Sequence, residues 1–267
     1  MSLKKSFKLS LAVVMLILGL SYFVEPRSTS TSVGDVSLSD FRHAVELIEQ
    51  QFGIALVFDQ GTEALPEAWQ IPPANGRATP ADWGCLASYL SVVEVELAKY
   101  KPEIVVRHLD TLFVFRDLEL FGVGYGGTVV ANEIMLTLDC DAGYTKAYFA
   151  RALHHEFSSI LINLSGFPLD KWLEINPPSF RYLESDEDIL ESVAIYTDRA
   201  GHDDLYQAGF LTYYGQSTVE NDINTYAELL MTDPVFLAQL AEKHERVKAK
   251  AALLEAFYLN HIKSTPE

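Results

Sequence analysis

Hydrophobic residues recur every three to four positions near the start of the folded part of the chain. The folded part is expected to start near Ser37, and this spacing predicts a helix with Ser39 or Asp40 as its cap. Its apolar positions are Phe41, Val45, Leu47, Ile48 and Phe52. The run IALVF then predicts a short strand. Prolines predict a loop over residues 61–83, and a second helix is predicted over residues 80–100.

The pattern changes to β-branched and aromatic runs after residue 102. Four such runs, separated by Asp110 and by glycines, predict four strands. They are EIVVRHL, TLFVFRDLELFG, GTVVAN and EIMLTLD, at residues 103–109, 111–122, 127–132 and 133–139. The last strand leads directly into a predicted helix that contains HHEFSS.

The rest of the chain is predicted to be irregular at first and then helical. Glycine and prolines interrupt residues 166–178. After the loop GFLTYYGQ, Ser217 and Glu220 are expected to form a capping box for a helix over residues 218–231, and another helical stretch is predicted over residues 234–261. Helices, then a sheet, then further helices indicate an α+β fold.

The N-terminus has the pattern of an export signal. A basic start, MSLKKSFK, precedes an apolar run at residues 9–24, which predicts a signal peptide or signal anchor over residues 1–27. Residues 28–36 are a predicted linker, residues 37–100 a predicted N-terminal helical region, and residues 101–267 a predicted second domain. The folded part is therefore expected to be periplasmic or extracellular. Any anchor in the inner membrane would be residues 9–24.

The folded part is strongly acidic. The whole chain has a formal net charge of −17, and residues 28–267 contain 16 basic and 36 acidic side chains. Such a surface repels phosphate, so nucleic acid is excluded as a partner and membrane contact is left to the N-terminal segment. The densest acidic run predicts the start of a solvated helix within residues 185–201.

The chain contains two cysteines, Cys85 and Cys140. In an oxidising compartment they can form a disulfide. A pair of free buried thiols is equally compatible with the sequence.

The HHEFSS helix contains the beginning of a metal-binding motif. Zinc peptidases use H-E-x-x-H, in which two histidines one helical turn apart bind the metal and the glutamate acts as general base. Here His155 and Glu156 take the first two places, but Ser159 stands where the second histidine is required. His154 is no simple substitute, because adjacent residues point about 100° apart around a helix.

The segment from residue 208 to residue 262 contains the further motifs LTYYG and NTYAE. With the His-Glu helix, it resembles the bacterial zinc-binding metallopeptidases related to the catalytic domain of anthrax lethal factor, over about residues 100–261. The resemblance implies a zincin-like fold: a small mixed sheet, then the His-Glu helix, then a C-terminal helical subdomain. It also implies zinc as cofactor and peptides or proteins as substrates.

The resemblance assigns roles to individual residues. His155 is the first zinc ligand, Glu156 the general base, and Tyr214 in LTYYG the residue that stabilises the oxyanion. Two ligand positions depart from the family pattern, because Ser159 replaces the second histidine and Asn224 in NTYAE replaces a glutamate ligand. Since zinc sites draw their ligands from His, Glu, Asp and Cys, the pattern indicates a degenerate site.

A rearranged metal site is one consequence of these replacements. It would combine His155 and Glu228, the last residue of NTYAE, with Asp222 or His154 as weaker candidates. His202 is a more distant candidate.

A metal-free hydrogen-bond network is the other consequence, with His155 bonded to Glu228 while Ser159 and Asn224 fill the remaining space. Two main hypotheses for function follow. The first is an exported zinc metallopeptidase-like protein that acts on peptides or proteins with a degenerate metal site. The alternative is an inactive pseudopeptidase, a peptide- or protein-binding module of the cell envelope that uses strand addition beside residues 133–139. A purely structural envelope protein is a third hypothesis, whereas the lack of a G-x-S-x-G motif speaks against a serine hydrolase.

Overall fold

The first helix, α1 (Leu38–Phe52), forms where the hydrophobic spacing predicts it. The computed structural model describes residues 37–163, 166–183 and 203–259. The Ser37 side chain, rather than Ser39 or Asp40, caps α1 by accepting a hydrogen bond from the backbone N–H of Asp40. The predicted leader and linker lie outside the described residues, and no described helix is long and apolar enough to cross a membrane.

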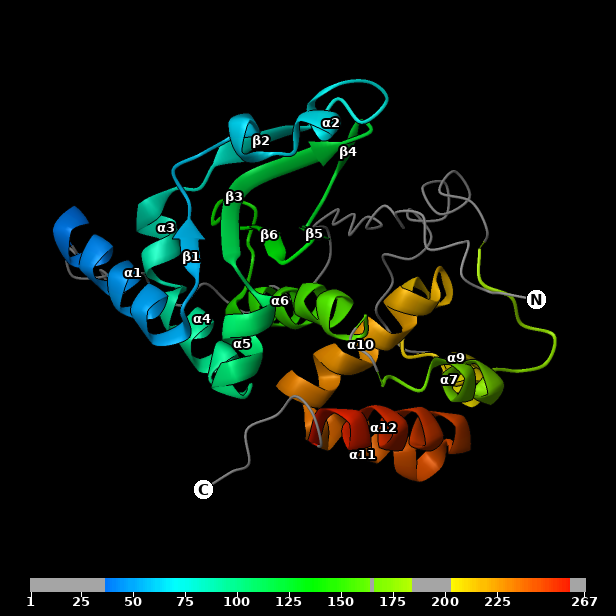
Figure 1. The fold of residues 1–267 in the computed structure, drawn as a ribbon. Coiled ribbons are helices and arrows are strands. Elements are labelled where there is room, and N and C mark those ends of the chain that lie inside the picture. The colour runs from blue at the N-terminus through cyan, green and yellow to red at the C-terminus, as the bar shows by residue number, and fades with distance from the viewer. Residues whose placement is uncertain (1–36, 164–165, 184–202, 260–267) are drawn as a thin grey trace.

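The centre of the fold is a mixed sheet, as predicted. Its strands are β1 (Ala55–Val57), β2 (Arg77–Pro80), β3 (Thr111–Leu120), β4 (Val123–Gly124), β5 (Gly127–Val130) and β6 (Glu133–Thr137). The main order is β1-β3-β6-β5, with β1, β3 and β6 parallel and β5 antiparallel to β6. Strands β2 and β4 pair antiparallel with β3. Figure 1 shows the long β3 running through the middle of the sheet.

The first predicted strand of this region, residues 103–109, is instead the helix α5 (Pro102–His108). Proline is favoured at the first helical position, and acidic and basic residues suit the first and last turns. Pro102 takes that position, Glu103 lies in the first turn, and Arg107 and His108 lie in the last. These end signals, together with burial of one face, outweigh the strand preference of the β-branched residues.

Two other expectations between residues 61 and 100 also need correction. The predicted loop contains the 3₁₀ turn η1 (Thr62–Ala64), the short helix α2 (Glu67–Gln70) and β2. The predicted second helix is two helices, α3 (Trp83–Ala87) and α4 (Leu90–Leu97). They are separated by a tight turn in which the N–H of Ser88 donates to the carbonyl of Cys85.

The two cysteines form a disulfide. Cys85 in α3 is bonded to Cys140 in the loop after β6, with a Cα–Cα distance of 5.9 Å. The bond joins the predicted N-terminal helical region to the loop that leads into the His-Glu helix. Of the two alternatives open from the sequence, the structure has the disulfide.

The His-Glu helix is α6 (Lys146–Leu161), which packs on one face of the sheet. Helix α10 (Val219–Thr232) crosses α6, and Figure 1 shows both beneath the sheet with the C-terminal helices below them. The other helical elements of this half are α7 (Leu169–Ile175), α9 (Asp203–Ala208), η2 (Tyr214–Gln216), α11 (Pro234–Lys243) and α12 (Glu245–Phe257). The α6–α10 crossing brings together the two segments that contain the motifs.

Several boundaries in this half differ from those predicted. The region expected to be irregular contains α7, and the last helical stretch is divided at His244 into α11 and α12. Thr218 caps α10 in place of the expected Ser217, because its side chain accepts the N–H of Asn221. The predicted acidic helix within residues 185–201 lies outside the described residues.

Candidate functional site

Helix α6 is buried along most of its length. Thr145 caps it by accepting the N–H of Tyr148, and nearly every residue from Phe149 to Leu161 is shielded from solvent. The sheet covers one side of the helix, while α4 and α10 cover others. Its polar residues therefore lie in the protein interior, where polar groups need hydrogen-bond partners.

His155 is bonded to Glu228. The His155 Nδ1 lies 2.8 Å from Glu228 Oε1, and both side chains are buried. A carboxylate at Nδ1 fixes the ring and directs Nε2 away from it, which is how proteins orient histidines that use Nε2 for binding. The pairing predicted for the metal-free network is confirmed.

Ser159 and Asn224 are bonded to each other one helical turn further along. The Asn224 Nδ2 donates to Ser159 Oγ at 2.7 Å, and both residues are buried. The Asn224 Oδ1 is also buried and has no hydrogen-bond partner within the described residues. The two positions that depart from the family's ligand pattern thus form the second pair of the predicted network.

Glu156 faces the edge of the sheet. A Cβ atom on Gly127 of β5 would lie 2.7 Å from Glu156 Oε1, so the close approach of the strand requires glycine. Burial, reinforced by the charges of Glu220 and Glu228 and opposed by His155, raises the pKa of Glu156 to about 7. Glu156 can therefore gain or lose a proton near neutral pH, as a general base must. Sequence reasoning missed Gly127, although a glycine that opens a β-branched run is a signal of close approach.

Tyr214 lies beside His155, with 5.8 Å between the ring centroids. Its loop is held in place because its carbonyl accepts the Ser217 hydroxyl, whose oxygen accepts the Asn221 amide. His155, Glu156, Tyr214 and Glu228 therefore belong to one buried cluster, the His155 cluster.

His154 points away from this cluster. Its Nδ1 lies 2.6 Å from the Tyr100 hydroxyl and its Nε2 lies 2.5 Å from Glu96 on α4. Burial lowers the pKa of His154, and Glu96 opposes that shift. Lys99 also bonds Glu96. His154 therefore connects α6 to α4 rather than supplementing His155.

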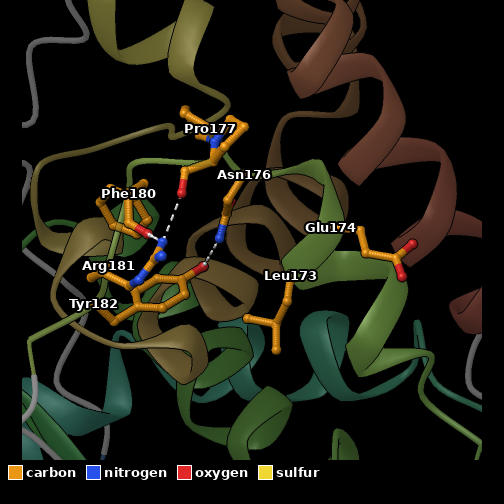
Figure 2. Close-up of a pocket in the computed structure, with 8 residues that line it drawn as sticks. Leu173, Glu174, Asn176, Pro177, Phe180, Arg181 and Tyr182 are labelled. Atoms are coloured by element: carbon orange, nitrogen blue, oxygen red, sulfur yellow. Dashed lines mark hydrogen bonds between the residues drawn. The ribbon is translucent and has the colours of Figure 1, made fainter.

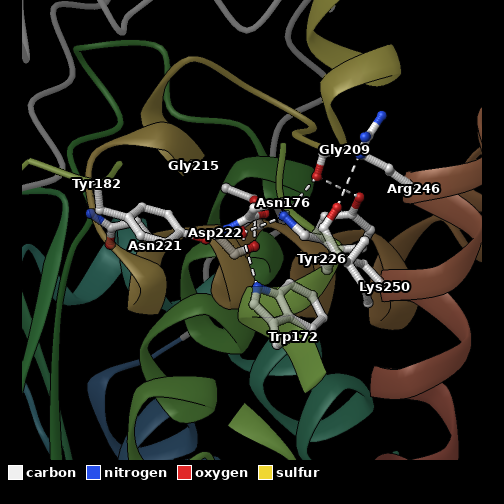
Figure 3. A network of polar contacts seen from close by, with 12 residues as sticks. Trp172, Asn176, Tyr182, Gly209, Gly215, Asn221, Asp222, Tyr226, Arg246 and Lys250 are labelled. Carbon is white, nitrogen blue, oxygen red and sulfur yellow. Dashed lines mark hydrogen bonds and ion pairs between the residues drawn. The ribbon is translucent and has the colours of Figure 1, made fainter. Parts of the chain in front are cut away.

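Asp222 also lies apart from the His155 cluster. Adjacent helical residues are about 100° apart, so positions 222 and 224 of α10 face nearly opposite directions. The Asp222 Oδ2 accepts from the Lys250 ammonium at 2.6 Å and from the Trp172 ring N–H at 2.9 Å. It also accepts from the Tyr182 hydroxyl at 2.5 Å. Figure 3 shows these groups converging on Asp222 from α7, α12 and the intervening chain. Lys250 was missed by sequence reasoning, since a lysine in an alanine- and lysine-rich helix gives no sign of being buried.

A pocket of about 420 Å³ lies next to the Asp222 network (Figure 2). It is lined by the end of α7 and by Asn176, Pro177, Pro178, Phe180, Arg181 and Tyr182. The Asn176 amide donates to the Tyr182 hydroxyl, which links the pocket wall to Asp222. Its lining residues include none of the predicted site residues.

The donor set at the α6–α10 crossing does not fit the zinc that the resemblance implies. A catalytic zinc site needs three ligands drawn from His, Glu, Asp or Cys. Among the described residues, no three such side chains are placed to hold a metal ion, and His202 lies outside them. The neutral Ser159–Asn224 pair stands where the resemblance assigns two of the ligands.

Comparison with known proteins gives a fold relative. No protein-family model matches the sequence, and no curated protein matches it. The fold is similar to the crystal structure of a "putative zinc-binding metallo-peptidase" from Bacteroides caccae, with a TM-score of 0.51 and 14% sequence identity. The match covers 85% of this chain and 88% of that chain. The predicted α+β fold of the metallopeptidase type is confirmed, and at this identity the likeness concerns the fold alone.

Proposed function

We propose that this chain is an exported, zincin-type pseudopeptidase that binds an extended peptide or protein segment along β5, beside Glu156. The observation that carries the proposal is the edge of β5. Among the described residues, β5 pairs with β6 on one side and with no strand on the other. An unpaired strand edge offers main-chain groups for pairing with a further strand.

The hydrogen-bond register identifies which groups of β5 are available. In an antiparallel strand, the backbone N–H and C=O groups of one residue bond the partner strand, and those of the next residue point away from it. Thr137 donates to the carbonyl of Gly126, and the register continues as Gly127 opposite Leu136. The backbone N–H and C=O groups of Gly127 and Val129 therefore point away from β6.

Strand addition beside residues 133–139, as expected from the sequence, is corrected by this topology. Strand β6 has β3 on one side and β5 on the other, so neither of its edges is open. Since Gly127 lies against Glu156, a peptide paired with β5 would run past the His155 cluster.

Two features support export. The apolar run at residues 9–24 follows a basic start, which is typical of an export signal. The Cys85–Cys140 disulfide suits an oxidising compartment such as the periplasm or the cell exterior.

Replacing Val129 by proline tests the peptide-binding proposal. Proline removes an N–H that points away from β6, so the sheet should keep its internal pairing while the edge loses a donor. A library of random twelve-residue peptides would be screened against the full chain, and the best binder titrated by fluorescence anisotropy. We expect Val129→Pro to weaken binding of that peptide at least about tenfold, the effect of losing roughly one hydrogen bond in the complex.

Val129→Thr is the matched control, since it keeps both the N–H and the β-branched shape. It should bind the peptide as the natural chain does. Equal affinity of the Val129→Pro variant, with an unchanged circular dichroism spectrum, would contradict binding along β5.

Peptide hydrolysis is the second candidate function, favoured by one observation. Glu156, with a pKa of about 7 beside His155 and Tyr214, has the properties of a general base. Cleavage of casein by the full chain that disappears in Glu156→Gln would establish this candidate and refute the pseudopeptidase. Peptide binding that Glu156→Gln leaves intact, with no cleavage by the natural chain, favours the binding module.

A further inference from the structure

Two hydrogen-bonded pairs connect α6 and α10 like successive rungs. His155 and Ser159 are one turn apart on α6, and Asn224 and Glu228 are one turn apart on α10. His155 bonds Glu228 at 2.8 Å, and Ser159 bonds Asn224 at 2.7 Å. All four side chains are at least nine-tenths buried. We call these four residues the α6–α10 clamp.

We propose that the α6–α10 clamp holds the two helices together without a metal ion. We further propose that it lies at a latent zinc site, where suitable residues at positions 159 and 224 would restore zinc binding. This inference goes beyond peptide binding and does not depend on it. It concerns the contacts that hold α6 and α10 together and the residue changes that would give this chain a metal site.

The orientation of His155 is the first argument. Glu228 engages Nδ1, so the other ring nitrogen, Nε2, is directed away from Glu228. Metal-binding histidines commonly have this arrangement, in which a carboxylate at one nitrogen orients the other nitrogen toward the metal. Glu228 therefore already holds the His155 ring in the way that a carboxylate holds a metal-binding histidine.

The convergence of positions 159 and 224 is the second argument. Donor atoms that share a tetrahedral zinc at about 2 Å lie about 3.3 Å from each other. The Ser159 and Asn224 side chains already approach to 2.7 Å, so ligands at these positions can meet at one ion.

The unsatisfied carbonyl of Asn224 is the third argument. Its Oδ1 is buried without a hydrogen-bond partner within the described residues. Buried acceptors normally have partners, and leaving one unpaired costs free energy. A ligand oxygen at position 224 would therefore replace an acceptor that the clamp leaves unsatisfied.

Zinc binding by restored variants tests the proposal. The full chain would be purified without chelator, alongside Ser159→Cys with Asn224→Asp and, separately, Ser159→His with Asn224→Glu. The Cys/Asp variant nearly preserves the natural side-chain shapes, so it protects the test if the larger His/Glu side chains prevent folding. Zinc content is measured by elemental mass spectrometry and affinity by competition with a chromogenic chelator.

We expect one zinc per chain in a folded double variant, with affinity on the order of 100-fold or more above that of the natural chain. Adding His155→Ala to the double variant should abolish that binding. Zinc should raise the melting temperature of the double variant, whereas a chelator should leave that of the natural chain unchanged.

Two results would overturn the inference. Stoichiometric zinc in the natural chain, lost in His155→Ala, would mean that the clamp is itself a metal site. A Cys/Asp variant with the natural circular dichroism spectrum and no zinc uptake would mean that the positions do not converge on an ion.

Discussion

At the scale of single residues, the buried carboxyl of Glu156 is the most informative group of the site. It is only 4% exposed, and the backbone of β5 approaches it so closely that only glycine fits at position 127. A carboxylate in such a place loses its hydration, which disfavours the charged form. The site therefore places a proton-exchanging group near the neutral Ser159–Asn224 pair.

The raised pKa of Glu156 predicts a pH-dependent effect of the Glu156→Gln substitution on stability. The pKa of the folded protein, about 7, lies above the ordinary value of 4.5. Glu156 thus stabilises the fold fully below about pH 4.5, and this contribution is lost as the pH rises through 7, because the unfolded chain releases the proton first. Glutamine does not titrate. Between pH 4.5 and pH 8, the free energy of unfolding of the Glu156→Gln variant should therefore rise by on the order of 3 kcal/mol relative to that of the natural chain.

Urea denaturation of both proteins across that pH range would measure the difference. If the free energies of unfolding of the two proteins change equally with pH, Glu156 ionises normally in the folded state. The nearby Glu228→Gln variant is a useful comparison, since it removes a charge from the same cluster without removing Glu156.

At the scale of helices and strands, the buried Asp222–Lys250 pair fixes α10 to the C-terminal helices. Both side chains are fully buried, and Lys250 also donates to the carbonyl of Gly209. The Lys250 ammonium lies 4.2 Å from the ring centroid of Phe210. Burial raises the pKa of Asp222 and lowers that of Lys250, so each charge depends on the other.

Removing one member of this pair should cost more than removing both. Asp222→Asn leaves a buried ammonium without its counter-charge, and we expect it to lower the free energy of unfolding by about 3–5 kcal/mol. Adding Lys250→Met to that variant should recover much of the loss, because no unpaired charge is left. Chemical denaturation of the single and double variants measures this coupling. If the double variant is as unstable as Asp222→Asn alone, the pairing contributes no coupling energy.

The elements that could be predicted from sequence are those with a strong local pattern. The spacing of apolar residues in α1 and the run of β-branched and aromatic residues in β3 gave the right element types, and the HHEFSS and NTYAE segments were correctly placed on helices. The α5 segment was wrongly predicted as a strand because its β-branched residues were given more weight than the proline and charges at its ends.

A local sequence pattern does not show which residues far away in the sequence a side chain will contact. The network of His155, Glu228, Ser159 and Asn224 was predictable because a resemblance aligned the two segments. Nothing within α12 indicates that Lys250 meets Asp222, because the two residues come together only through helix packing. The position of β5 at the sheet edge likewise depends on the pairing order and not on its own sequence.

At the scale of the whole molecule, the regions predicted as residues 37–100 and 101–267 share one core. The largest hydrophobic cluster extends from Phe41 in α1 to Tyr258 at the end of α12. The Cys85–Cys140 bond links the same two regions across 55 residues. Such sharing favours a single cooperative unfolding transition over separate ones.

The disulfide should make a large contribution to that transition. Closing a loop of 55 residues removes chain entropy from the unfolded state, worth about 4 kcal/mol at 25 °C. We therefore expect the Cys85→Ser, Cys140→Ser double variant to unfold in one transition at lower urea concentration, with the natural chain in reducing agent showing the same shift. A loss below about 1 kcal/mol would contradict the entropic estimate. Two separate transitions would show that the regions fold independently, and that the bond, rather than the shared core, makes them one unit.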